Sequence, residues 1–224
     1  MSALRTYTPM TALSAPVVDP WLYPLLLPLH RILMQGYFGT LHVSGQEHLP
    51  PQGPVVWAVK HYSRWDPLVI AQLSPKPLYF MTNANQFVGF QGWLIQRLGA
   101  FPVDLNRPQL SSLRSAVTLL HQGQPLVIFP EGGIVRDRPL RSLKPGAARL
   151  VLQAEATAPQ PGTIPIVPIG LKYDPAPQVG AQIWIQIGKP LSTADLPPNL
   201  EVKMAAHQLT QQLQAALLDC LMVL

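Results

Sequence analysis

Short apolar runs alternate along the chain with stretches in which apolar residues recur every three or four positions. The run at 54–59 contains no polar residue, which is typical of a strand covered on both faces of a sheet. Strands are predicted at 41–43, 54–59, 78–81, 100–103, 125–129, 164–169 and 182–187, and helices directly after Asp66 and at 86–98, 109–121, 147–155 and 202–224. The alternation predicts an α/β fold, with a mixed, largely parallel central sheet covered by helices on both faces.

The segment 16–38 is the most apolar part of the N-terminal region, but Asp19 and the prolines at 20, 24 and 28 interrupt it. A membrane-spanning helix needs about 20 consecutive apolar residues, so a monotopic helical segment lying in the membrane interface is favoured. Trp21 and Tyr37 are residue types that favour the headgroup level. The alternative is a helix packed on the protein's own core. The predicted division is an N-terminal membrane-associating segment at 1–38 and one domain at 39–224.

Composition supports contact with a lipid surface. Hydrophobic residues make up 48% of the 224 residues and charged residues 12%, about half the charged share of ordinary soluble proteins. The net charge of +5 lies in the segment 97–149, which holds eight of the 16 basic residues but three of the 11 acidic ones. That excess suits a phosphate-bearing substrate or an anionic lipid surface.

Two other classes are disfavoured. The basic segment lacks interleaved aromatic residues and no nucleic-acid-binding motif is visible, so no nucleic-acid partner is expected. The single cysteine, Cys220, excludes an intrachain disulfide, and its place among the leucines of the predicted C-terminal helix indicates a packing residue.

The strongest candidate chemistry follows the strand at 54–59, where His61 and Asp66 lie five positions apart. On a tight turn that opens into a helix, Asp66 can accept the Nδ1 proton of His61 and leave Nε2 free as a general base. The alternative is a surface turn in which Asp66 caps the helix.

Four segments are predicted at strand ends, where ligand crevices of open α/β sheets lie. They read His61-x4-Asp66, Gly99-Ala100-Phe101-Pro102-Val103-Asp104, Phe129-Pro130-Glu131-Gly132-Gly133 and Ile164-Pro165-Ile166-Val167-Pro168-Ile169. Their order and spacing resemble the H-x4-D, G-x-F, F-P-E-G and V/I-P-V/I blocks of the glycerolipid acyltransferase family, typified by bacterial 1-acyl-sn-glycerol-3-phosphate acyltransferases. Lys144-Pro145-Gly146 matches a K-x-G that often follows the third block, and the resemblance covers about 45–188.

The resemblance implies an enzyme of phospholipid biosynthesis that is membrane-associated, monotopic or peripheral, on the cytoplasmic face. It would transfer a fatty acyl group from acyl-CoA or acyl carrier protein to the free hydroxyl of 1-acyl-sn-glycerol 3-phosphate, giving phosphatidic acid. His61 and Asp66 would be the general-base dyad. No metal and no cofactor beyond the acyl thioester co-substrate is implied, and no G-x-S-x-G elbow for a covalent acyl-enzyme is present.

The resemblance also assigns substrate contacts. Glu131 would bind acceptor hydroxyls or brace the site, against an ordinary turn-capping role. Gly132 and Gly133 would let backbone approach a ligand, against an ordinary tight turn.

Three departures from the family pattern affect the predicted phosphate site. The second block continues into Asp104-Leu105 where arginine is usual, leaving Arg107 as the nearest candidate; the third block has Gly133-Ile134, leaving Arg136. Lys60 replaces the asparagine that commonly precedes the histidine, and either lowers the imidazole's proton affinity or contacts phosphate. Arg107 and Arg136 are predicted to bind phosphate, against a solvated basic loop. A different lysolipid or alcohol acceptor, and a non-catalytic membrane-binding module of the same fold, are the alternatives.

Overall fold

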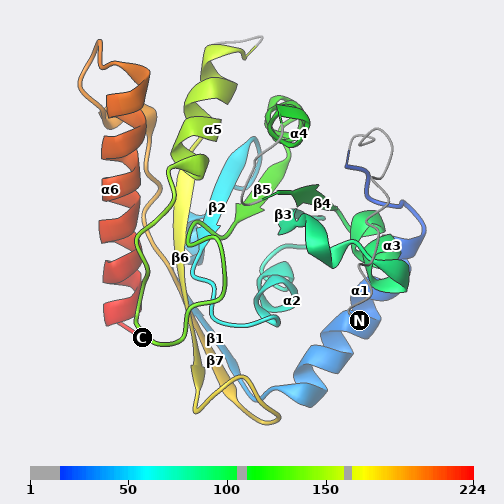
Figure 1. Cartoon of the computed structure of the whole chain (residues 1–224). Coiled ribbons are helices and arrows are strands. Elements are labelled where there is room, and N and C mark those ends of the chain that lie inside the picture. The colour runs from blue at the N-terminus through cyan, green and yellow to red at the C-terminus, as the bar shows by residue number, and fades with distance from the viewer. Residues whose placement is uncertain (1–15, 105–109, 159–162) are drawn as a thin grey trace, which may run out of the picture.

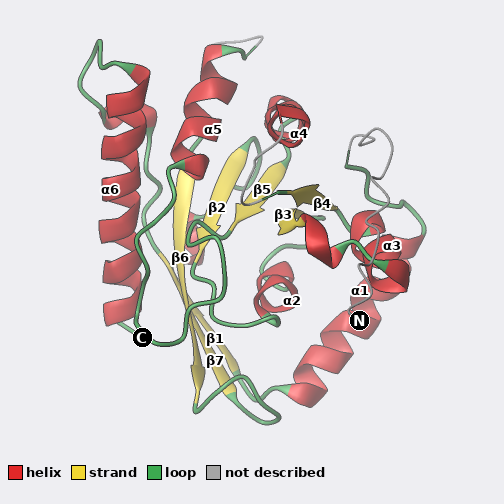
Figure 2. Cartoon of the chain, in the orientation of Figure 1, coloured by secondary structure: helices red, strands yellow, loops and turns green. Residues whose placement is uncertain are grey.

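The central sheet is built from the short apolar runs of the sequence. The computed structural model describes residues 16–104, 110–158 and 163–224. Seven strands pair in the order β1-β7-β6-β2-β5-β3-β4 (Figures 1 and 2). They are β1 (Leu41–Ser44), β2 (Val55–Val59), β3 (Tyr79–Asn83), β4 (Ala100–Val103), β5 (Pro125–Ile128), β6 (Ile166–Asp174) and β7 (Gln182–Ile187).

One antiparallel pairing divides the sheet. Strands β6, β2, β5, β3 and β4 run in one direction, and β7 pairs antiparallel with β6. Strand β1 is parallel to β7, so these two run opposite to the rest. The prediction of a mixed, largely parallel sheet is confirmed.

Helices cover both faces of this sheet. They are α1 (Leu22–Tyr37), α2 (Asp66–Ala71), α3 (Gly89–Arg97), α4 (Leu110–His121), α5 (Gly146–Ala156) and α6 (Val202–Met222). Alternate residues of β2 enter opposite cores. Val56 and Ala58 pack with α4, α5 and α6, whereas Val55, Trp57 and Val59 share a core with α2 and the C-terminal end of α1 (Figure 1). This is why the run at 54–59 is apolar throughout.

Helix α6 packs unusually close to the sheet. A Cβ atom added to Gly170 would lie 2.9 Å from Cβ of Cys220, and one added to Gly188 would lie 2.8 Å from its Sγ. These two glycines therefore leave room for the buried Cys220 side chain, and its predicted packing role is confirmed.

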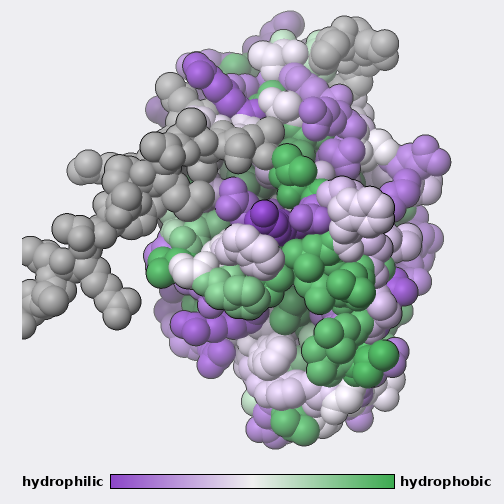
Figure 3. All heavy atoms as spheres, turned by 90° about the vertical axis from the view of Figure 1, so that its right-hand side faces the viewer, coloured by the Kyte–Doolittle hydropathy of each residue, from purple (hydrophilic) through white to green (hydrophobic). Residues whose placement is uncertain are grey.

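Helix α1 contains most of the interrupted apolar segment at 16–38. Pro24 lies in its first turn, where backbone N–H groups lack helical partners, and Pro28 lies inside it. Met34 is its one residue buried in the protein, and Phe38 follows it into the same core. Large apolar side chains on α1 and at its start are exposed, namely Trp21, Leu25, Leu29, Ile32 and Leu33. Apolar side chains gather on the side of the molecule where α1 lies (Figure 3).

No helix in the described ranges is long and apolar enough to cross a bilayer. Helix α1 packs on the core through its C-terminal end, as the alternative predicted. Most of its length stays exposed, and its contact with a membrane stays a prediction.

Two predicted boundaries were wrong, and the first of them affects the site. Strand β6 was expected to end at 169 but continues to Asp174, because residues beyond Ile169 pair with β7 alone. Helix α3 begins at Gly89 rather than at 86, because residues Ala84–Gln86 form a separate 3-10 turn that the Asn83 side chain caps.

Candidate active site

His61 and Asp66 meet on the turn between β2 and α2. Nδ1 of His61 lies 2.8 Å from Oδ2 of Asp66. The carboxylate is fully buried, while the His61 side chain keeps 18% of its surface exposed. Because a carboxylate accepts but does not donate, Nδ1 carries the proton and Nε2 has the free lone pair. The predicted hydrogen bond is confirmed, and the catalytic role stays a prediction.

Backbone groups of the same turn hold the carboxylate. The N–H groups of Tyr62 and Ser63 donate to Oδ2 of Asp66 at 2.6 and 2.8 Å. Asp66 is also the first residue of α2. The alternative, a surface turn in which Asp66 caps the helix, is wrong, because the carboxylate is buried and α2 has no side-chain cap. The two backbone N–H groups instead aim the carboxylate at the imidazole.

Tyr173 completes the surroundings of Asp66 and was missed by the sequence analysis. Its hydroxyl donates to Oδ1 of Asp66 at 2.8 Å, and the residue is 3% exposed. Burial, followed by the charge and hydrogen bond of Asp66, raises the pKa of Tyr173 above its ordinary value. The alternation of buried Leu171 and Tyr173 with exposed Lys172 and Asp174 is a signal that would have extended β6 to this residue.

Phe129 brings the third sequence block to the histidine. It follows β5, the neighbour of β2, and its ring stacks on the His61 imidazole with centroids 4.1 Å apart. The N–H of Val135 donates to the carbonyl oxygen of His61 at 2.9 Å. The first and third blocks therefore converge, as parallel strand ends predict.

Lys60 and Glu131 form a buried ion pair beside the dyad. The Lys60 ammonium lies 2.9 and 3.1 Å from the two Glu131 oxygens and 3.0 Å from the Val135 carbonyl oxygen. The Glu131 carboxylate also accepts the backbone N–H groups of His61 and Arg141. It is therefore placed as a brace between the turns after β2 and β5.

Burial argues against direct substrate contact by this pair. Lys60 is 2% exposed and Glu131 1% exposed. The interpretation of Lys60 as a phosphate contact is corrected: its ammonium is paired with Glu131 and withdrawn from solvent. Of the two roles predicted for Glu131, the geometry fits bracing rather than hydroxyl binding.

Gly132 and Gly133 behave differently in the turn that follows. Gly132 has a φ of +70°, and a Cβ there would lie 2.7 Å from the Lys144 side chain, so the turn itself accounts for this glycine. Gly133 has no atom within 4 Å of its added Cβ, which leaves space beside its backbone. Contact of either glycine with a substrate stays a prediction.

Arg136 lies at the edge of the site. It is exposed, its Nε donates to the carbonyl oxygen of Tyr62 at 3.0 Å, and its guanidinium lies 6.0 Å from the centre of the Tyr62 ring. The structure thus brings this arginine beside the His61 turn. Arg107 lies outside the described residues.

The second and fourth blocks occupy different places. Ile169 of the fourth block accepts a hydrogen bond from the Lys60 N–H, so β6 adjoins the dyad. Strand β4, with the second block, is three strands from β2, about 14 Å at the usual spacing. The expectation that all four segments converge is therefore corrected for the second.

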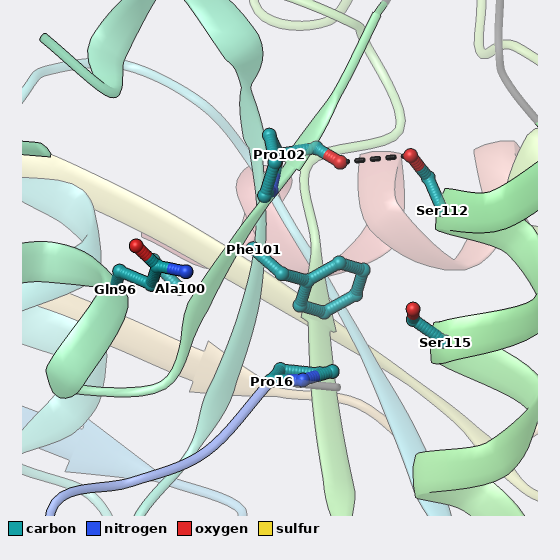
Figure 4. A pocket seen from close by; sticks show the side chains of 7 residues that line it. All are labelled: Pro16, Gln96, Ala100, Phe101, Pro102, Ser112 and Ser115. Carbon is teal, nitrogen blue, oxygen red and sulfur yellow. Dashed lines mark hydrogen bonds between the residues drawn. The ribbon is translucent and has the colours of Figure 1, made fainter. Parts of the chain in front are cut away.

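The crevice beside β4 is a packing gap. Phe101 and Pro102 of β4 line it together with Ser112 and Ser115 of α4, and the Ser112 hydroxyl donates to the Pro102 carbonyl oxygen (Figure 4). Its volume of about 10 Å³ is at most that of one water molecule. Within the described residues, no group of three or more His, Cys, Asp or Glu side chains could hold a metal ion.

Comparisons with known proteins identify relatives of this chain. The chain is 28% identical over 141 residues to the 1-acyl-sn-glycerol-3-phosphate acyltransferase of Streptococcus pneumoniae, covering 61% of this chain and 52% of that one. It is 27% identical over 187 residues to the Bacillus subtilis protein of the same name, covering 79% of this chain and 87% of that one. It therefore spans about half the length of the first relative and most of the second.

A solved structure shares the fold. The 1-acyl-sn-glycerophosphate acyltransferase of Thermotoga maritima superposes with a TM-score of 0.63 over 88% of this chain and 80% of that one, at 16% sequence identity. The Acyltransferase family profile matches residues 40–172, more than half of the chain. The chain therefore belongs to the acyltransferase family.

Proposed function

We propose that the chain transfers a fatty acyl group from an acyl thioester, acyl-CoA or acyl carrier protein, to the free hydroxyl of 1-acyl-sn-glycerol 3-phosphate, giving phosphatidic acid. The observation that carries the proposal is the hydrogen bond from Nδ1 of the partly exposed His61 to the buried Asp66. The names of the two bacterial relatives support this acceptor.

The dyad supplies acid–base chemistry for direct transfer. Nε2 of His61 takes the proton of the acceptor hydroxyl as its oxygen forms a bond to the thioester carbonyl carbon. Asp66 stabilises the imidazolium that results. The carbon–sulfur bond then breaks, and the departing thiolate takes the proton from Nε2. Stacking on Phe129 limits rotation of the ring during both proton transfers.

Arg136 is the described residue best placed for the acceptor phosphate. Its Nε donates to the Tyr62 carbonyl oxygen, and its two terminal nitrogens form no hydrogen bond with another described residue. Two parallel N–H groups of a guanidinium fit two phosphate oxygens. Arg107 is proposed as a second contact on sequence grounds alone.

A second candidate is transfer to a different lysolipid or to an uncharged alcohol. Gly133 and Ile134 occupy positions where the family pattern favours a polar residue and a cation. The ammonium of Lys60 forms an ion pair with Glu131. Both observations remove cations from the neighbourhood in which an acceptor phosphate is expected.

We also propose that the protein is monotopic, with α1 lying in the membrane interface. Leu25, Leu29, Ile32 and Leu33 lie on one side of the helix at helical spacing and are 49–70% exposed. The net positive charge favours anionic headgroups.

The deciding experiment offers the purified protein a radiolabelled acyl-CoA, and separately the same labelled acyl group on acyl carrier protein. Three acceptors are tested in parallel: 1-acyl-glycerol 3-phosphate, lysophosphatidylcholine and glycerol 3-phosphate. Labelled phosphatidic acid as the dominant product is expected. Labelled phosphatidylcholine would instead support the second candidate.

The His61→Ala variant tests the dyad in the same assay. Loss of a general base lowers turnover by about 10²–10⁴-fold. His207→Ala, an exposed histidine on α6, is the matched control and should retain full activity. Unchanged turnover in His61→Ala would overturn the assigned base.

A further inference from the structure

Tyr173 reaches the dyad from an unusual position in the sheet. It lies near the end of β6, beyond the last residue that pairs with β2, on the part that pairs with β7 alone. Its ring packs near Phe38, which follows α1, and near Tyr62 of the His61 turn, with centroids 5.7 and 5.9 Å away. The ring is thus held on two sides while its hydroxyl points at Asp66.

The two oxygens of Asp66 have unequal surroundings. Oδ2 accepts from Nδ1 of His61 and from the N–H groups of Tyr62 and Ser63. Oδ1 accepts from the Tyr173 hydroxyl, its one donor among the described residues. The hydrogen bond from Tyr173 therefore orients Oδ1 and stabilises the negative charge of the Asp66 carboxylate, which has no exposed surface.

The hydroxyl is a dependable donor because it does not ionise in the ordinary pH range. Burial is the first cause of its raised pKa, and the charge of Asp66 is the second. A protonated tyrosine beside an ionised aspartate has one way to satisfy the carboxylate, which is to donate its proton in a hydrogen bond.

We propose that Tyr173 is a positioning residue for the proposed acyl transfer: by donating to Oδ1 of Asp66 it fixes the carboxylate and limits how strongly that carboxylate holds the His61 imidazolium. The catalytic meaning of this role rests on the proposed function. The electrostatic effect on His61 does not, and it can be measured without turnover.

Among the described residues, the other charged groups near the histidine have partners other than this tyrosine. Glu131 accepts the His61 backbone N–H and is neutralised by Lys60, and Arg136 binds the Tyr62 carbonyl oxygen. Asp66 is the described charged residue that is hydrogen-bonded to the imidazole. Removing the Tyr173 hydroxyl leaves these groups in place. It leaves more negative charge on Asp66, which favours the imidazolium.

The test is the Tyr173→Phe variant, with the six histidines observed by NMR as a function of pH and the His61 signal assigned by its loss in His61→Ala. The His61 titration midpoint is expected to move to higher pH by about 0.5 unit. In an Asp66→Asn background the same substitution should cause no shift. An unchanged or lowered midpoint in the Asp66-containing protein would overturn the proposal.

Activity gives the second readout. The acid limb of kcat/KM in Tyr173→Phe should move to higher pH by the same amount, with kcat reduced several-fold at its plateau and KM for the acyl thioester unchanged. A merely structural tyrosine would lower activity equally at all pH values. Tyr79→Phe, which removes a hydroxyl from a half-buried tyrosine on β3, is the matched control and should leave the limb in place.

The two readouts separate the possible failures. A shifted NMR midpoint in a protein that transfers no acyl group to any acceptor would refute the proposed function and keep the electrostatic role. An active protein whose midpoint and acid limb do not move would refute the role of Tyr173 and keep the function. Thermal melting confirms that each variant is folded.

Discussion

Lys60 shows how burial changes the role of a charged residue. The lysine precedes the catalytic candidate and was expected to act on the imidazole or on phosphate. Instead its ammonium joins Glu131 in a site where neither side chain reaches solvent. Two buried charges that satisfy each other cost desolvation energy, but they hold the turns after β2 and β5 in fixed relation.

Removing one partner of this ion pair should lower the stability of the folded protein. Lys60→Met leaves the Glu131 carboxylate buried without its cation and should lower the free energy of unfolding by about 3–5 kcal/mol. Urea denaturation measures the loss. Glu131→Gln in the Lys60→Met background removes the orphaned charge and should restore part of it.

Lys189→Met is the matched control, because Lys189 is exposed. It should change the free energy of unfolding by less than about 0.5 kcal/mol. Equal effects at the two lysines would contradict the structural role of the Lys60–Glu131 pair.

Sequence spacing predicts contacts within one turn better than contacts across the sheet. His61 and Asp66 are five residues apart, so the geometry of a single turn brings them together. Lys60 and Glu131 are 71 residues apart, and Tyr173 and Asp66 are 107 apart. Those contacts depend on strand order and on the length of β6, which hydrophobic pattern alone does not fix.

At the scale of elements, α1 and α3 form one connected surface. The Asp19 backbone N–H donates to the Arg97 carbonyl oxygen at 2.8 Å, and their side chains form an ion pair at 3.5 Å. The N–H groups of Leu22 and Trp21 donate to the Asp19 carboxylate and hold its pKa below the ordinary value. The start of α1 is thereby tied to the end of α3.

The outer face of α3 resembles a membrane-interface surface. Phe90 and Trp93 are exposed and stack with centroids 5.5 Å apart, and the Arg97 guanidinium lies 4.5 Å from the centre of the Trp93 ring. Tryptophan and arginine both favour the headgroup region. The sequence predicted this helix but not its exposed aromatic face, because helical spacing alone does not show which side faces the protein.

Vesicle sedimentation tests the proposed contact of α1 with lipid, and it tests whether the exposed aromatic face of α3 shares in that contact. Leu25→Ser/Ile32→Ser on α1 should weaken binding to phosphatidylglycerol-containing vesicles by at least about tenfold, because each buried aliphatic side chain contributes more than 1 kcal/mol. Phe90→Ser/Trp93→Ser on α3 should weaken it in the same direction.

The matched control for these variants lies on α6, on the opposite side of the molecule from α1 and α3 (Figure 1). Val202→Ser/Met222→Ser alters side chains that are 67% and 76% exposed, so loss of apolar surface alone is reproduced there. Equal weakening by the α6 variant would contradict a membrane face on α1 and α3.

Point substitutions are preferable to truncation here. Deleting 1–38 would remove Met34 and Phe38 from the core that also contains β2. It would also remove the ring of Tyr37, which packs 4.5 Å from that of Trp65 in the His61 turn. If such a truncated protein lost activity, the cause could be release from the membrane or loss of the packing that supports the His61 turn.

At the scale of the whole molecule, the pattern predicted the fold class and the coverage of both sheet faces, because buried strands and amphipathic helices leave strong periodic signals. It did not predict that β1 and β7 run opposite to the other strands. The direction of β7 depends on the connection between Asp174 and Gln182, which returns the chain antiparallel to β6. Nor did the pattern predict the strand order, which places β4 and the second block three strands from β2 and the dyad.

The close approach of α6 to the sheet makes the reactivity of the Cys220 thiol a measure of whether the protein is folded. Cys220 is the single thiol of the chain and lies between α6 and the glycines of β6 and the segment after β7. Burial raises the pKa of this thiol, which further limits its reaction with electrophiles. A maleimide should therefore label the folded protein about 10³-fold more slowly than the denatured chain.

Gly170→Ala would place a methyl group against Cys220 and should speed this reaction, whereas Gly36→Ala, with nothing within 4 Å of the added carbon, should leave it unchanged. Fast labelling of the unaltered protein would contradict the packing of α6. With the labelling rate of the unaltered protein known, the same measurement can be made on each inactive variant. An unchanged rate indicates loss of the catalytic group alone, and a faster rate indicates loss of packing.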